Sequence, residues 1–172
     1  QVGSNATFTT PALNANTTYY VGGASGAAQS ATQVYTITST GQLFNMGSSC
    51  GAGSYYSCGS GLRGFNWVDN LPAGTQITNV QIQISVGVVC TNGALPIFLN
   101  NNPGSPFSPN YHCSCNGSNN SIFSFNFPGN QYVVGGANQF RINASSCTGL
   151  FNGNGSLSGQ FARITVTYQG AS

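Results

Sequence analysis

Ionisable side chains are almost absent from this 172-residue chain. It contains no lysine or glutamate; its charged side chains are Asp69, Arg63, Arg141 and Arg163, and its one histidine is His112. General acid–base catalysis depends on positioned titratable groups, and glycoside hydrolysis depends on two carboxylates. A Ser–His–Asp triad would have to use Asp69 and His112, and no G-x-S-x-G motif accompanies them. We therefore expect a protein that is not an enzyme and needs no cofactor.

Two further absences exclude other classes of partner. The net charge of +2 is too small and too dispersed for a nucleic-acid-binding surface. No apolar run approaches the ~20 residues of a membrane helix, so we expect no membrane insertion. Asn, Ser, Thr, Gln and Gly take the place of the missing charges. Such a surface is insensitive to pH and salt and lets like subunits approach, which favours an extracellular or cell-surface location.

Cysteine is the chemically distinctive residue that remains. Six cysteines in a chain of this composition predict an oxidised framework. Cys50 and Cys58 bracket a short loop that a disulfide could close. Cys113 and Cys115 are too close in sequence to bond readily to each other, so we expect each to bond to a different partner. A zinc site next to His112 is the alternative. The set comprises Cys50, Cys58, Cys90, Cys113, Cys115 and Cys147, with Cys90 and Cys147 the expected partners of Cys113 and Cys115.

Glycosylation sequons are frequent as well. In a chain so rich in Asn, Ser and Thr they also arise by chance, so both interpretations stay open. If they are used, they mark exposed loops. The six sites are Asn5, Asn16, Asn116, Asn119, Asn143 and Asn154.

Alternation of apolar and polar residues predicts strands throughout the chain, and helical periodicity is missing. Gly-, Pro- and Asn-rich turns separate the strands, which is typical of an all-β, antiparallel β-sandwich of the Ig-like or jelly-roll kind. The predicted strands are Gln33–Ser39, Gly64–Asp69, Ile77–Val89, Pro96–Leu99, Ile122–Phe127, Gln131–Val134, Asn138–Asn143 and Phe161–Tyr168. We assign residues 31–172 to this disulfide-stapled domain and residues 1–30 to an N-terminal strand segment with a linker.

Two stretches resemble a known group of proteins. The segment from Phe8 to Val21, FTTPALNANTTYYV, resembles the last two strands of Ig-like repeats in large secreted surface proteins of Bacteroidota. The stretch from Phe65 to Val80, FNWVDNLPAGTQITNV, together with four of the cysteines, resembles a β-sandwich module of the same proteins, which include gliding-motility adhesins and type 9 secretion cargo. The resemblance implies a surface-displayed structural or adhesive role without catalytic residues, in contact with neighbouring domains of a long surface protein.

The N-terminal segment departs from that pattern because it is only a fragment of a repeat. It is either the tail of a preceding domain or a strand donated to the sheet edge of a neighbouring copy. Strand addition satisfies unpaired backbone groups and buries alternate side chains, and a head-to-tail contact of this kind builds a filament. The side chains expected to be buried are Phe8, Leu13, Tyr19 and Val21.

Aromatic side chains offer an alternative function, lectin-like binding of a polysaccharide. Trp67 is either a core residue, with Asp69 capping the turn that follows, or a platform on which a sugar stacks. Tyr55, Tyr56 and Tyr111 are expected in loops that could extend the platform. Arg141 and Arg163 are expected on the solvent face of their strands. A single carboxylate is a poor calcium ligand set, so we expect no metal site.

Overall fold

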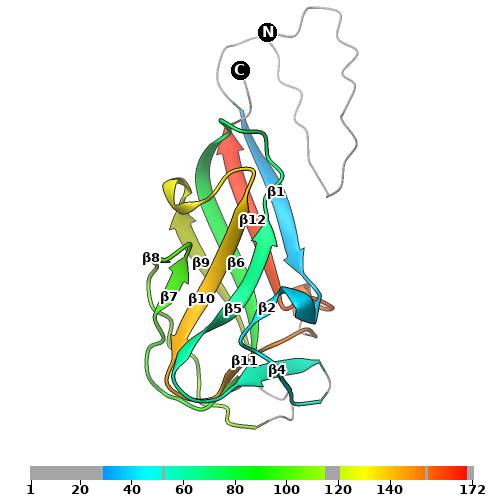
Figure 1. The fold of residues 1–172 in the computed structure, drawn as a ribbon, viewed down its shortest axis with the longest axis vertical. Coiled ribbons are helices and arrows are strands. Elements are labelled where there is room, and N and C mark those ends of the chain that lie inside the picture. The colour runs from blue at the N-terminus through cyan, green and yellow to red at the C-terminus, as the bar shows by residue number, and fades with distance from the viewer. Residues whose placement is uncertain (1–28, 52, 115–120, 154, 170–172) are drawn as a thin grey trace, which may run out of the picture.

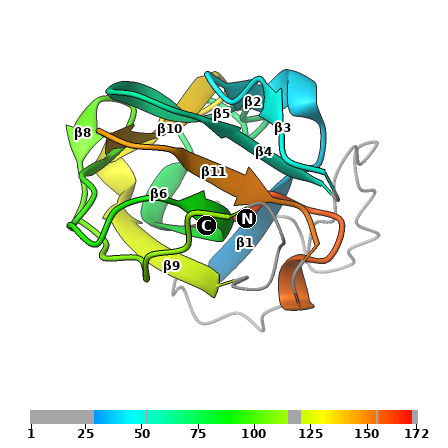
Figure 2. The same ribbon diagram turned by 90° about the horizontal axis from the view of Figure 1, so that it is seen from below.

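The computed structural model describes residues 29–51, 53–114, 121–153 and 155–169. Over these ranges the chain is an antiparallel all-β sandwich, which confirms the fold class that the alternating pattern predicts. Figures 1 and 2 show the two layers, with the five-stranded sheet in front of the seven-stranded sheet in the first view. The described residues include no helix with the length and hydrophobicity to cross a membrane.

The seven-stranded sheet is built around the longest strand, β6 (Gln76–Val89). Strand β12 (Ala162–Gln169) pairs with the first part of β6, and β1 (Ser30–Ile37) pairs with the outer side of β12. Strand β9 (Ser121–Pro128) pairs with the opposite side of β6. The remaining strands add to the last part of β6, in the order β11 (Thr148–Phe151), β4 (Ser54–Ser57) and β3 (Ser48–Ser49).

The five-stranded sheet covers the other side of the core. Its order is β2 (Leu43–Phe44), β5 (Gly61–Val68), β10 (Ala137–Ala144), β7 (Ile97–Leu99) and β8 (Asn102–Pro103). Three short 3-10 helices lie in the connections, η1 (Thr40–Gln42), η2 (Gly129–Gln131) and η3 (Gly155–Leu157).

Alternation places the apolar side chains between the two sheets. In β6, Val80, Ile82 and Ile84 are fully buried, whereas Gln81 and Gln83 face outward and are partly exposed. Aromatic rings join the layers: the ring of Phe140 in β10 stacks on that of Phe125 in β9 at a centroid distance of 5.8 Å. Each such side chain contributes roughly 1.5–3 kcal/mol through burial, so this layer of rings and aliphatic side chains is a main source of stability.

The two ends of the sandwich differ. Ser30 of β1 pairs with Gln169 of β12, so the described chain enters and leaves at the same end (Figure 1). Strands β4 and β11 lie at the opposite end, together with the loops that carry the cysteines (Figure 1). The disulfide-bonded end is therefore remote from both ends of the described chain.

One predicted strand is wrong. Gln131–Val134 is not a strand but the end of η2 and the turn after it. The reason is that a side chain replaces the strand partner: the Val133 N–H donates to Asn138 Oδ1 at 2.9 Å, and Asn138 Nδ2 donates to the Val133 carbonyl at 2.8 Å. Strands β4 and β11, by contrast, were not predicted, because they are short and pair with segments far away in sequence.

Some predictions concern residues outside the described ranges. They include the N-terminal strand segment with Phe8, Leu13, Tyr19 and Val21, and the sequons at Asn5, Asn16, Asn116, Asn119 and Asn154. The remaining sequon, Asn143, lies exposed near the end of β10.

Candidate functional site

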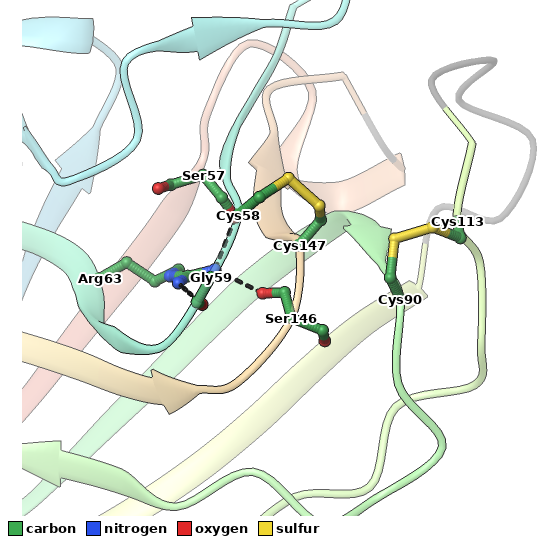
Figure 3. Close-up of a disulfide and its surroundings, with 8 residues drawn as sticks. All are labelled: Ser57, Cys58, Gly59, Arg63, Cys90, Cys113, Ser146 and Cys147. Atoms are coloured by element: carbon green, nitrogen blue, oxygen red, sulfur yellow. Dashed lines mark hydrogen bonds between the residues drawn. A yellow bond between two sulfur atoms is a disulfide. The ribbon is translucent and has the colours of Figure 1, made fainter.

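Disulfides close the end of the sandwich that carries β4 and β11. Cys58 is bonded to Cys147 and Cys90 to Cys113 (Figure 3), and Cys50 is disulfide-bonded as well. Cys115 lies outside the described residues. The prediction that Cys90 bonds to one of the two neighbouring cysteines is confirmed, and that cysteine is Cys113.

The predicted Cys50–Cys58 bond is wrong, and so is the assignment of Cys147 to the C-x-C pair. Strand register explains the observed bond. Ser57 at the end of β4 pairs with Thr148 at the start of β11. Cys58 comes directly after Ser57 and Cys147 directly before Thr148, so the two cysteines lie side by side. Sequence analysis missed this contact because it missed both strands.

The zinc alternative is also wrong in the form proposed. A zinc site needs thiolates, and the Cys113 sulfur is instead bonded to that of Cys90. The ring of His112 lies 3.4 Å from the hydroxyl of Ser114. No cluster of three His, Cys, Asp or Glu side chains that could hold a metal occurs in the part of the chain that the structure describes.

A buried arginine supports the Cys58–Cys147 disulfide. Arg63 is 2% exposed, and it donates from Nη1 to the carbonyls of Ser57 (2.5 Å) and Ser146 (2.7 Å) and from Nη2 to that of Gly59 (2.6 Å) (Figure 3). These carbonyls belong to residues next to the two bonded cysteines. Burial lowers the pKa of Arg63. The guanidinium fixes both chain segments at the disulfide by charge-assisted hydrogen bonds to backbone carbonyls.

The one carboxylate of the chain is buried near the opposite end. Asp69 Oδ1 accepts hydrogen bonds from the hydroxyls of Tyr35 (2.5 Å) and Tyr132 (2.8 Å). Asp69 Oδ2 accepts from the backbone N–H groups of Leu71 (3.2 Å) and Gly135 (2.6 Å). The bond to Leu71 is the turn cap that the sequence predicts. Because Tyr35 belongs to β1 and Asp69 follows β5, the carboxylate ties the two sheets together.

Both tyrosines of this cluster resist ionisation. Burial is the main cause that raises the pKa of Tyr35 well above its ordinary value, and the hydrogen bond to Asp69 adds to it. Burial likewise raises the pKa of Tyr132, and the negative charge of Asp69 reinforces the shift. A phenolate here would be desolvated next to a carboxylate, so both hydroxyls stay protonated as hydrogen-bond donors.

The geometry does not assemble a catalytic triad. Asp69 lies against Tyr35, which the sheet register places level with Ile82 of β6. His112 pairs with Val89 near the other end of the same strand. These levels are about 23 Å apart at the usual rise of a strand. All four donors to Asp69 come from tyrosines and backbone, so this carboxylate orients no histidine.

Trp67 does not offer a surface to a sugar. It is 5% exposed, its ring centroid lies 5.8 Å from that of Phe65, and Nε1 donates to the hydroxyl of Tyr132 at 3.3 Å. The prediction of a sugar platform at Trp67 is therefore wrong, because its position in β5 faces the core.

The three loop tyrosines are not gathered around Trp67 either. Tyr55 and Tyr56 lie in β4 rather than in a loop and are half-buried, and the ring of Tyr55 packs edge-on against Phe161. Tyr111 is 56% exposed beside the Cys90–Cys113 disulfide. Only Tyr111 keeps the exposure that a stacking platform needs.

The two strand arginines behave differently. Arg163 on β12 is half-buried and donates to the Ser156 carbonyl at 2.7 Å and to Gln160 Oε1 at 3.3 Å. Arg141 on β10 lies on the predicted outer face of its sheet, because its neighbours Phe140 and Ile142 face the core, but it is covered there and only 5% exposed. Burial lowers the pKa of Arg141, and its guanidinium carbon lies 4.0 Å from the ring centroid of Phe44.

The edge of the seven-stranded sheet is the feature most relevant to strand addition. Within the described residues β1 is paired with β12 and with no other strand. Its register with β12 runs without a shift from Ser30 to Ile37, and the sequence of the strand, SATQVYTI, contains no charge and no proline. Proteins ordinarily protect an exposed edge with charge, proline or a bulge, and β1 has none of these.

Comparison with known proteins adds little to the geometry. No family model matches the chain, and no curated protein matches it in sequence. Among solved structures, the crystal structure of a Podospora anserina GH26-CBM35 β-(1,4)-mannanase aligns with 82% of this chain at 13% identity and a TM-score of 0.40. The chain spans 28% of that enzyme's chain. A likeness at this level carries no information about activity.

Proposed function

We propose that the chain is a non-enzymatic module of an extracellular adhesin or fibre, and that it joins copies of itself or neighbouring modules by strand addition at β1. The observation that carries the proposal is the edge strand β1, eight residues without charge, proline or bulge, which among the described residues pairs with β12 alone. A second strand laid along this edge would continue the backbone hydrogen bonding of the sheet and extend it.

The chemistry of the described residues supports a role that depends on shape rather than on reaction. The single carboxylate, Asp69, is enclosed by four hydrogen-bond donors, and Arg63 and Arg141 are buried. What remains at the surface is mainly neutral, so copies meet without electrostatic repulsion. The disulfides support an oxidising, extracellular location.

The donated strand in this proposal is the segment around residues 7–21 of a neighbouring copy. It precedes β1 in the sequence, and its apolar residues, Phe8, Leu13, Tyr19 and Val21, supply side chains for burial. Because donor and acceptor lie on different copies, the contact repeats without closing and produces a filament.

Electron microscopy and sedimentation of three variants test the proposal. Deletion of residues 1–28 removes the donor and is expected to abolish filaments. Val34→Lys adds a charge to the acceptor edge and is expected to reduce assembly strongly. Thr165→Lys is the matched control, since Thr165 pairs with Val34 but lies on the inner strand β12. Thr165→Lys adds the same charge at the paired position, away from the sheet edge, and is expected to leave assembly intact. Filaments that persist after the deletion would contradict the proposal.

A further inference from the structure

The outer face of the five-stranded sheet carries a row of residues that neither the core nor the β1 edge uses. The strand registers align Phe44, Gly64, Arg141, Phe98 and Pro103 across β2, β5, β10, β7 and β8. Residues directly opposite one another point to the same face of a sheet. Their neighbours in sequence, such as Phe65 and Phe140, are buried, so this row faces away from the core.

Arg141 organises the middle of the row. Its Nη1 donates to the backbone carbonyls of Phe65 (2.8 Å) and Phe140 (2.9 Å), and its Nη2 donates to Asn66 Oδ1 (2.7 Å) and Gln139 Oε1 (2.8 Å). Both amide oxygens are therefore engaged by the guanidinium. This fixes each amide so that its NH2 group points away from the arginine, and Asn66 is exposed to solvent.

Gly64 makes this arrangement possible. Gly64 stands between Phe44 and Arg141 in the register, so the arginine side chain crosses β5 at Gly64 to bring its guanidinium within 4.0 Å of the Phe44 ring centroid. A Cβ on Gly64 would lie 2.0 Å from the Phe140 carbonyl oxygen. The contact with Phe44 is a cation–π interaction that holds the two side chains together on the outer face of the sheet.

The outer face combines the rings of this row with the hydrogen-bond donors beside it. Phe98 is half-buried and Pro103 is exposed, so both keep part of their ring surface in solvent. From β2 to β8 the row is about 19 Å long at the usual strand spacing. Its only charged residue is Arg141, whose terminal N–H groups already bind protein oxygens. A matching ligand is long, uncharged and rich in hydroxyl oxygens, with apolar ring faces.

We propose that this row binds a neutral polysaccharide. Its sugar rings stack on Phe98 and Pro103, and its hydroxyl oxygens accept hydrogen bonds from Asn66. Arg141 is a positioning residue that orients the amides. The site is separate from the β1 edge, which lies in the other sheet, and it differs from the loop aromatics that the sequence indicated.

Affinity electrophoresis tests the proposal, with the full chain run through gels that contain one of four neutral polymers, galactomannan, xyloglucan, mixed-linkage β-glucan or dextran, or the anionic polymer alginate for comparison. At least one of these neutral polymers is expected to retard the chain at low and at high salt. Phe98→Ala and Asn66→Ala are each expected to weaken binding about tenfold, the equivalent of one lost stacking or hydrogen-bonding contact. Tyr111→Ala is the control for loss of an exposed ring elsewhere, because Tyr111 is 56% exposed and its neighbour His112 pairs with Val89 in the other sheet.

Three results would overturn the proposal: no retardation by any of the four polymers, unchanged retardation of Phe98→Ala and Asn66→Ala, or retardation only by alginate that disappears at high salt. Thermal unfolding of each variant verifies that the fold is intact. Electron microscopy of Phe98→Ala separates this site from strand addition, since filaments are expected to form normally when sugar binding is lost.

Discussion

Tyr132 gives the sharpest test of the buried Asp69 cluster. Its hydroxyl donates to Asp69 Oδ1 at 2.8 Å and accepts from Trp67 Nε1 at 3.3 Å. In Tyr132→Phe the carboxylate loses one of its donors while the ring still fills the core. A hydrogen bond to a buried charged group is worth about 2 kcal/mol, so the free energy of unfolding at neutral pH should fall by that amount.

The pH dependence distinguishes this contact from simple packing. Burial raises the pKa of Tyr132 in the folded protein, whereas in the unfolded chain it titrates near pH 10. Above about pH 10 the unfolded state therefore binds fewer protons than the folded state, and the stability falls as pH rises by about 1.4 kcal/mol per unit for this tyrosine. Tyr132→Phe has no ionisable hydroxyl at this position, so this loss of stability with rising pH is absent from the variant. The difference in the free energy of unfolding between wild type and Tyr132→Phe should therefore narrow from about 2 kcal/mol at neutral pH to about 0.6 kcal/mol at about pH 11.

Chemical denaturation followed by tryptophan fluorescence measures both effects, because Trp67 is the single tryptophan and lies in the cluster. Tyr111→Phe is the control, since Tyr111 is 56% exposed, and its pH profile should match that of wild type. If Tyr132→Phe loses stability with rising pH as steeply as wild type, the assignment of Tyr132 as a protonated donor to Asp69 is refuted.

Three further changes test other parts of the structure. Arg63→Met removes the donor to three carbonyls in part-buried hydrogen bonds, and the free energy of unfolding should fall by about 3 kcal/mol in chemical denaturation. Gly64→Ala places a Cβ against a backbone carbonyl and should cost about 1–3 kcal/mol in the same assay, whereas Gly47→Ala, with nothing within 4 Å, should be tolerated. Replacing both cysteines of Cys58–Cys147 by serine should lower the thermal midpoint more than the same change at Cys90–Cys113. The closed loops span 89 and 23 residues, and the chain-entropy model gives about 4.6 and 3.4 kcal/mol. Equal shifts would contradict the loop-length argument.

Strand periodicity made the architecture predictable. The alternation from Val80 to Ile84 identifies the buried face of β6 correctly, because one side of that strand packs on the core and the other meets solvent. The same alternation puts Arg141 on the outer face of its sheet, and that is where it lies. Its burial could not be predicted, because the covering groups, Phe44 and Gly64, come from other strands and depend on the register.

The disulfide pattern was unpredictable for a related reason. Cys58 meets Cys147 only because β4 and β11 pair, and both strands are short. Gly149 lacks a side chain at the point of closest approach, where a Cβ would lie 2.3 Å from the Tyr55 carbonyl oxygen. A glycine weakens the strand pattern in the sequence, although here it is what permits the contact.

The most direct test of strand addition is a cryo-electron-microscopy structure of the assembled material at a resolution that separates strands. The account predicts a further strand from a neighbouring copy, hydrogen-bonded along β1 and continuous with the seven-stranded sheet. Assemblies in which β1 borders solvent, or a chain that stays monomeric at every concentration, would contradict it.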